Sequence, residues 1–295
     1  MSKHTTRRNV LKGLALGGSA MITAPLVTSA SAATNPEKKM LKGNVNHSVC
    51  RWTYSTYSVE DLCKHVKDIG FAAIDLVGPK DWPTLKQYGI FSSMCNGAEI
   101  SINDGWNNKQ FHPTLLKNYS DNIDLVSQAG YKNLICFSGA RKGMDDETGL
   151  KNCAEGLKQI MAQAEKKGVI VQMELLNSKV NHKDYMCDRS AWGVELCKRI
   201  GSPNFKLLYD IYHMQIDEGD VIRTIRDNHQ YFGHYHTGGV PGRNEIDDSQ
   251  ELYYPAIVKC IFDELKFTGY LAQEFIPARE DKIASLRQAI HICDV

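Results

Sequence analysis

The sequence predicts an α/β protein built as a single (β/α)8 barrel. Strand-like and helix-like segments alternate eight times, and several helical segments end at a glycine just before the next strand. The span 33–295 also has the length of one such barrel. No second folded domain is expected.

The first half of the barrel begins with a strand and a well-marked helix. Ser58 is a suitable N-cap, Glu60 and Asp61 lie in the first helical turn, and Gly70 stands where a left-handed cap is needed. The elements expected here are strands at 45–54, 72–77, 90–95 and 133–137, and helices at 58–69, 82–88 and 114–129.

In the second half, Gly168 and Gly201 follow two helical segments in the same way. The elements expected here are strands at 169–175, 205–210, 231–236 and 270–275, and helices at 149–167, 190–200, 221–228, 254–265 and 281–290.

The segment 96–113 is long for the connection between a strand and a helix, and it is rich in Gly, Asn and Ser. At the mouth of a barrel such a loop is typically a lid or a substrate wall, and a surface insertion without a role is the alternative. Trp52 and Trp106 are candidates for the wall, with ordinary packing as the alternative.

Residues 1–32 have the three parts of a twin-arginine signal peptide. Arg7 and Arg8 stand in TRRNVLK, an apolar stretch covers 14–27, and ASA at 30–32 is a cleavage site. Pro25 interrupts the apolar stretch, which is also too short for a membrane anchor. We expect export to the periplasm or cell envelope, a linker at 33–43, a barrel domain at 44–295 and no stable membrane insertion. A disordered basic tail is the alternative.

The bulk composition argues against nucleic-acid binding and against disulfides. The formal net charge of +1 falls to −3 without the signal, because four cations and no acid leave with it, and no basic block remains. Nine cysteines are an odd number, contain no C-x-x-C pair and fall mostly within apolar patterns, which indicates buried free thiols. A homo-oligomer is compatible with the sequence.

Ligand-type side chains stand near the ends of the last four predicted strands, and they are Glu174, Asp210, His236 and Glu274. Because the strand ends of a barrel converge on one face, we expect these side chains to meet. Three carboxylates and an imidazole would be costly there without a divalent cation. Any one of them alone would suit an ordinary ion pair, but the matched set predicts a catalytic metal site.

Three further residues lie near these strand ends. His213 follows Asp210 closely and could reach a substrate oxygen, with a core histidine as the alternative. His234 faces the same side as His236, and we place it one layer deeper, as a packing or supporting histidine. Arg243 follows a Pro-Gly turn and could clamp a carboxylate or phosphate, although loop arginines are often only solvated.

These motifs resemble the hydroxypyruvate isomerase family, within the xylose isomerase-like TIM barrels that include the ketose 3-epimerases. The resemblance runs from about residue 45 to the end and is closest at YDIYHMQ, at GHYH followed by VPGR, at ELLN and at EFIP. It implies that His213 and Arg243 hold the substrate, and that the metal ligands are Glu174, Asp210, His236 and Glu274.

The chain departs from the hydroxypyruvate isomerase pattern in three places. His236 stands where those enzymes carry Gln and the 3-epimerases carry His. The acidic, Gly-rich loop after the third strand is replaced by NGAEISINDGWNNKQF, and the signal peptide departs from the cytoplasmic enzymes. These differences leave the substrate open.

The chemistry of the residues agrees with an isomerase. Such a reaction removes a proton next to a carbonyl and returns it to the neighbouring carbon, and a divalent cation can stabilise the enediolate between the two steps. Glu174 and Glu274 are the candidates for base and acid. The oxygen-rich ligand set favours Mn²⁺, Mg²⁺ or Co²⁺, with Zn²⁺ as an alternative. We expect a small sugar or hydroxy-keto acid as substrate, nominally hydroxypyruvate converted to tartronate semialdehyde.

Other functions remain as alternatives. His236 favours a ketose 3-epimerase, and an envelope enzyme that acts on an oxidised sugar by elimination is also compatible. A DNA-repair endonuclease would need additional metal ligands and a basic surface. A non-catalytic sugar-binding barrel would predict the loss of at least one ligand, and all four are present.

Overall fold

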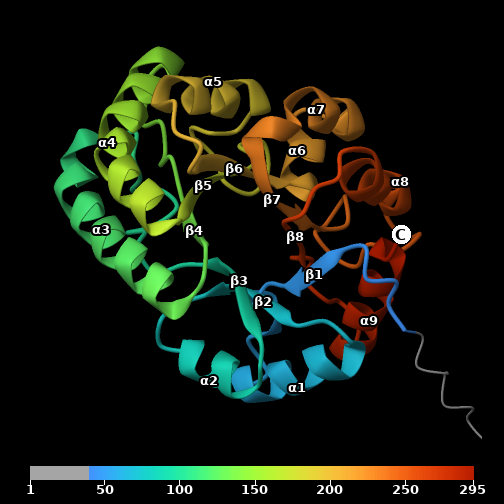
Figure 1. Cartoon of the computed structure of the whole chain (residues 1–295). Coiled ribbons are helices and arrows are strands. Elements are labelled where there is room, and N and C mark those ends of the chain that lie inside the picture. The colour runs from blue at the N-terminus through green and yellow to red at the C-terminus, as the bar shows by residue number, and fades with distance from the viewer. Residues whose placement is uncertain (1–39) are drawn as a thin grey trace, which may run out of the picture. The chain divides into compact units, whose positions relative to one another are not determined.

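The computed structural model describes residues 40–295, and the predicted (β/α)8 fold is confirmed. Eight parallel strands form one sheet in the order β1-β8-β7-β6-β5-β4-β3-β2. A parallel bridge between Cys50 and Asp75 joins the two end strands, so the barrel is nearly closed. Helices surround the strands (Figure 1).

The strands all lie within, or one or two residues from, the runs predicted for them, although the first is shorter. They are β1 Asn46–Val49, β2 Ala73–Val77, β3 Phe91–Cys95, β4 Asn133–Cys136, β5 Ile170–Leu175, β6 Phe205–Asp210, β7 Phe232–Thr237 and β8 Tyr270–Gln273.

The helices follow the strands around the barrel. They are α1 Val59–Ile69, α2 Trp82–Gln87, α3 His112–Ala129, α4 Asp146–Lys167, α5 Ser190–Ile200, α6 Ile211–Asp217, α7 Val221–Asn228, α8 Tyr254–Lys259 and α9 Lys282–Cys293. The predicted cap of α1 is confirmed, because the Ser58 hydroxyl accepts the backbone N–H of Asp61 and Gly70 adopts φ 110°.

Three elements differ from the prediction. The expected strand at 45–54 is too long, because the backbone N–H of Arg51 bonds to Asp75 and the chain then turns through a 3-10 helix at Trp52–Tyr54. Helix α6 was not predicted, since it follows β6 without a loop. Helix α8 changes into a π-helical turn at Cys260–Glu264 instead of continuing to residue 265.

The long loop at 96–113 is held firmly against the barrel, so Trp106 is not a substrate wall. Its ring is fully buried and packs against Tyr119 and His112, with ring centroids 5.2 and 5.7 Å away. A side chain at Gly105 would meet the backbone of residues 137–139 at about 2.5 Å, so the loop closely approaches the segment that follows β4. Ile102 is the loop residue that lines the pocket beside the predicted ligands, which is described below.

All nine cysteines are buried and free, as predicted. The predicted signal peptide and residues 33–39 of the predicted linker lie outside the described residues. At 40–43, Leu41 packs against the core and the backbone N–H of Lys42 bonds to the Asp294 carboxylate. Within 40–295, no helix is long and apolar enough to span a membrane.

Candidate metal centre and substrate pocket

The four predicted ligands lie together at one end of the barrel. Glu174 is on β5, Asp210 ends β6, His236 is on β7 and Glu274 directly follows β8. One ligand atom from each residue lies within 4.8 Å of the others, and all four side chains are buried. The parallel pairing of β6 with β7 places Asp210 opposite His236, which explains how residues distant in sequence reach one point.

The cluster is costly without a cation. Burial, and then the neighbouring Glu274, raise the pKa of Asp210, and burial also raises that of Glu174. Burial opposes ionisation of Glu274 as well, but the charge of Arg243 holds its pKa well below the usual range. Glu174 Oε1 and Asp210 Oδ2 are buried and have no hydrogen-bond partner within the described part of the chain. These orphaned oxygens and the oxygen-rich donor set suit a divalent metal ion.

His236 presents its Nδ1 atom to this cluster. Nδ1 lies 3.0 Å from Glu274 Oε2 and 3.2 Å from Glu174 Oε1, while Nε2 bonds to Asp75 Oδ1 at 3.0 Å. In a neutral imidazole whose Nε2–H is donated to Asp75, the Nδ1 lone pair would face two carboxylates. That arrangement needs a proton or a cation at Nδ1, so the ring orientation is compatible with a metal ion.

Arg243 lies over the cluster. Its Nη2 atom is 2.6 Å from Glu274 Oε2 and 3.6 Å from Asp210 Oδ2. The guanidinium carbon lies 5.2 Å from the Trp52 ring centroid and 5.3 Å from that of Tyr212, so two aromatic side chains hold it. Its Nε atom is buried and has no hydrogen-bond partner among residues 40–295, so this donor remains available.

His213 is a fully buried residue of α6, and its tautomer follows from Asn177. The side-chain oxygen of Asn177 accepts the backbone N–H groups of Val180 and Asn181, so the amide nitrogen must face His213 Nδ1, at 2.6 Å. Nδ1 is therefore an acceptor and Nε2 carries the proton. Burial, and then Arg243, keep the pKa of His213 well below its ordinary value, so the ring is a neutral donor. Its Nε2 has no hydrogen-bond partner and lies 3.6 Å from Asp210 Oδ2.

A pocket of about 310 Å³ opens onto the cluster. Apolar side chains make most of its wall, and its lining residues are Trp52, Leu76, Ile102, Phe137, Glu174, Leu176, His182, Arg243 and Glu274. Trp52 Nε1 donates to Glu274 Oε1 at 2.8 Å, so this tryptophan, unlike Trp106, does form part of the wall.

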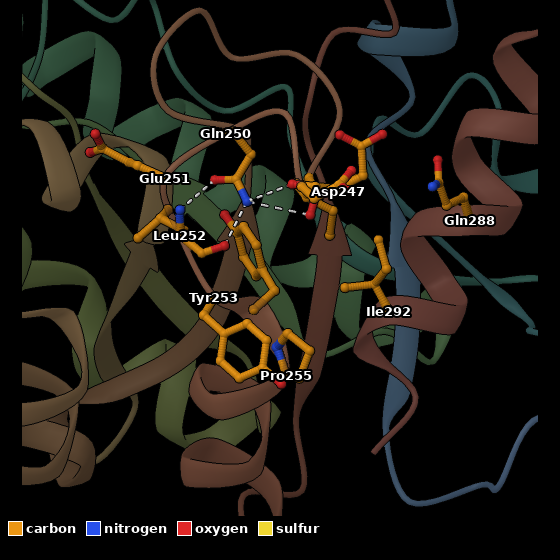
Figure 2. A pocket seen from close by; sticks show the side chains of 11 residues that line it. Asp247, Gln250, Glu251, Leu252, Tyr253, Pro255, Gln288 and Ile292 are labelled. Carbon is orange, nitrogen blue, oxygen red and sulfur yellow. Dashed lines mark hydrogen bonds between the residues drawn. The ribbon is translucent and has the colours of Figure 1, made fainter. Parts of the chain in front are cut away.

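A second pocket, of about 590 Å³, has a different lining and includes none of the predicted site residues. It lies between the segment after β7 and helix α9, which contributes Gln288 and Ile292 (Figure 2). Gln250 stabilises this segment through hydrogen bonds to the backbone of Asp247 and Leu252. Of these two pockets, only the smaller one is lined by predicted site residues, namely Glu174, Arg243 and Glu274.

The site contains one buried acid that the sequence analysis missed. Asp75 on β2 has no exposed surface and lies beneath His236, with Oδ2 2.8 Å from His234 Nε2. His234 thus lies deeper than the four ligands, where it was expected. The available signal was an isolated Asp inside an otherwise apolar strand, AIDLV.

One protein-family profile matches most of the chain. The sequence profile described as "Xylose isomerase-like TIM barrel" matches residues 63–293. A solved structure titled AP endonuclease, family 2 from Brucella melitensis is 21% identical with a TM-score of 0.74, over 82% of this chain and 96% of that one. At that identity the likeness concerns the fold alone.

Three curated relatives match parts of the chain. A 2-oxo-tetronate isomerase of Cupriavidus necator is 35% identical over 44% of this chain and 47% of its own. A protein of Homo sapiens provisionally named hydroxypyruvate isomerase is 29% identical over 43% of this chain and 44% of its own length. A D-psicose 3-epimerase of Ruminiclostridium cellulolyticum is 31% identical over 48% of each. Each alignment spans about half the length of the relative.

Proposed function

The chain belongs to the xylose isomerase-like TIM barrel family, and we propose that it is a divalent-metal-dependent isomerase of a small α-hydroxycarbonyl compound. The proposed reaction resembles the conversion of hydroxypyruvate to tartronate semialdehyde. The observation that supports it best is the buried convergence of Glu174, Asp210, His236 and Glu274 at the end of the barrel. The relatives named as isomerases of hydroxypyruvate and 2-oxo-tetronate agree with this class of substrate.

In this proposal the two glutamates move the proton. One takes a proton from the hydroxyl-bearing carbon, the neighbouring carbonyl carbon receives a proton, and the hydroxyl proton passes to the former carbonyl oxygen. The product is therefore an isomer of the substrate. Arg243 lowers the pKa of Glu274 while burial raises that of Glu174, and such a difference separates a base from an acid. When bound, the cation would supply positive charge that makes the proton next to the carbonyl easier to remove.

His213 and Arg243 would hold the substrate. Both present unpartnered buried donors, Nε2–H and Nε–H, beside the cluster. A hydroxy-keto acid offers a carboxylate for the guanidinium and a carbonyl or hydroxyl oxygen for the imidazole. These contacts would orient the reacting carbons toward the glutamates.

A second candidate is a ketose 3-epimerase or an enzyme acting on an oxidised sugar. A pocket of about 310 Å³ is generous for a three-carbon acid. Its wall away from the metal cluster is apolar, with Leu76, Ile102 and Phe137, and suits the carbon face of a longer substrate better than a second carboxylate. The D-psicose 3-epimerase relative supports the same alternative.

Metal analysis and two assays would test these candidates. We expect about one Mn²⁺, Mg²⁺ or Co²⁺ per purified chain, and conversion of hydroxypyruvate detected by NMR with solvent deuterium entering the product. Conversion of ketoses without any conversion of hydroxypyruvate would replace the first candidate by the second. A metal-loaded barrel that converts neither class and only binds sugars would contradict both.

We also propose that the protein is exported by the twin-arginine pathway to the periplasm or cell envelope. This proposal depends on the sequence of residues 1–32 alone. An enzyme exported in the folded state can carry a metal ion acquired in the cytoplasm, which is consistent with a deeply buried site.

A further inference from the structure

A buried carboxylate lies on the side of His236 that faces away from the proposed metal. We propose that Asp75 is a positioning residue, which holds His236 so that Nε2 carries the proton and Nδ1 is left free to bind the ion. This inference rests on the proposed metal site. Carboxylate–histidine–metal arrangements of this kind fix both the tautomer and the orientation of the ring.

The hydrogen bonds of Asp75 make it an acceptor toward His236. The Ser93 hydroxyl donates to Oδ2 at 2.6 Å, and Ser48 lies 2.6 Å from the same hydroxyl. The Cys50 thiol donates weakly to Oδ1 at 3.6 Å. Oδ1 then accepts the Nε2–H of His236 at 3.0 Å. Donors on β3 and β7, and the thiol of the residue that follows β1, therefore surround one carboxylate on β2.

The hydrogen-bond geometry indicates that Asp75 orients His236 and not His234. The His236 Nε2 contact has hydrogen-bond geometry. His234 Nε2 is closer to Asp75, at 2.8 Å, yet neither of its ring nitrogens is aligned with a hydrogen-bond partner. His234 therefore closes the space beside the carboxylate, while His236 receives its orienting hydrogen bond.

A second cation between Asp75, His234 and His236 is the competing explanation, because these three residues also bring ligand atoms within 4.8 Å of one another. It would bind His236 at Nε2 and so requires that nitrogen to lose its proton. The two explanations therefore predict opposite protonation of Nε2 and different metal stoichiometry.

The first test is Mn²⁺ binding to the full-length wild type, Asp75→Asn and Ser48→Ala. Asparagine keeps the shape but can turn an amide N–H toward His236, so we expect binding 10- to 100-fold weaker, the range for such supporting carboxylates. Ser48→Ala removes a hydroxyl of the same buried network that does not contact Asp75, and should bind within about twofold of wild type. Equal affinity in Asp75→Asn and wild type would overturn the proposal, as would two Mn²⁺ ions per wild-type chain with one lost in Asp75→Asn.

The second test needs no variant and no activity. In ¹⁵N-histidine NMR of wild-type protein, we expect His236 Nε2 to carry a proton that exchanges slowly with water, both without metal and with Mg²⁺. An unprotonated Nε2 would refute the role of Asp75, even if Asp75→Asn fails to fold. If the wild type binds no metal ion but Nε2 is protonated, the proposed function fails while the contact to Asp75 stands.

Discussion

At the scale of single residues, the cluster of Glu174, Asp210, His236 and Glu274 gathers charges that only a proton or a cation can offset. A single substitution removes one ligand of this cluster, and Asp210→Asn keeps a side-chain oxygen that can still cap α6. The consequences should therefore appear in metal binding before they appear in folding.

Each of Glu174→Gln, Asp210→Asn, His236→Ala and Glu274→Gln should remove metal binding or lower turnover by at least about 100-fold, the scale of lost acid–base catalysis. Circular dichroism should still report a folded barrel. Metal content and initial rates measured on each variant test this prediction. Two variants that keep both full activity and bound metal would contradict the assignment.

The effect of replacing Arg243 on KM should depend on whether the substrate carries a negative charge. If the substrate is a hydroxy-keto acid, Arg243→Ala should lose roughly 1.5–3 kcal/mol of binding to a charged group, which is about a 10- to 150-fold rise in KM for hydroxypyruvate. Arg243→Lys should recover part of this, because it keeps the charge but not the planar donors. An unchanged KM in both variants would argue that the substrate presents no anion to this residue.

At the scale of elements, the junction between β6 and α6 contributes to the metal cluster, whereas the loop after β3 contributes mainly to the core. Asp210 ends β6 and also caps α6, because its Oδ1 accepts the backbone N–H of His213 at 3.1 Å. One side chain thus terminates a strand, begins a helix and faces the metal cluster. The loop after β3 instead buries its tryptophan in the body of the protein.

Substitutions of Trp52 and Trp106 should have different effects, one mainly on substrate binding and the other mainly on stability. Trp106→Ala should cost about 3–5 kcal/mol of unfolding free energy, the usual penalty for emptying a buried aromatic site, with KM little changed. Trp52 is 41% exposed, so Trp52→Ala should cost much less stability but raise KM, because it lines the pocket and bonds to Glu274. Denaturant unfolding and kinetics on both variants test this. The opposite pattern would restore Trp106 as a substrate wall.

At the scale of the whole molecule, we propose that this nearly closed barrel is exported in the folded state. Nine buried thiols without disulfides suit a protein that folds before export, since its folding does not depend on oxidation. The folded barrel would then cross the membrane as one unit.

Replacing Arg7 and Arg8 by lysine should leave unprocessed protein in the cytoplasm, because the twin arginines are what the translocon for folded proteins recognises. Fractionation and mass measurement of the N-terminus check this, with the wild type as the processed control. Normal export and cleavage of the double variant would show that residues 1–32 are not such a signal.

The sequence by itself determined the architecture and the positions of the predicted ligands. Alternating strand and helix patterns, caps such as Ser58 and Gly70, and polar residues at strand ends are local properties, so they can be recognised without the fold. Knowledge of the barrel then sufficed to expect Glu174 and Asp210 at one point, because all strand ends share a face.

Only the tertiary structure decided how these residues are supported. Asp75 and His236 are 161 residues apart, and their hydrogen bond depends on where β2 and β7 lie in the closed barrel. The contrast between Trp52 at the pocket and Trp106 in the core has the same origin, since both are tryptophans in segments that follow a strand of the barrel. Long-range packing sets which neighbours a side chain meets, and no local pattern encodes that.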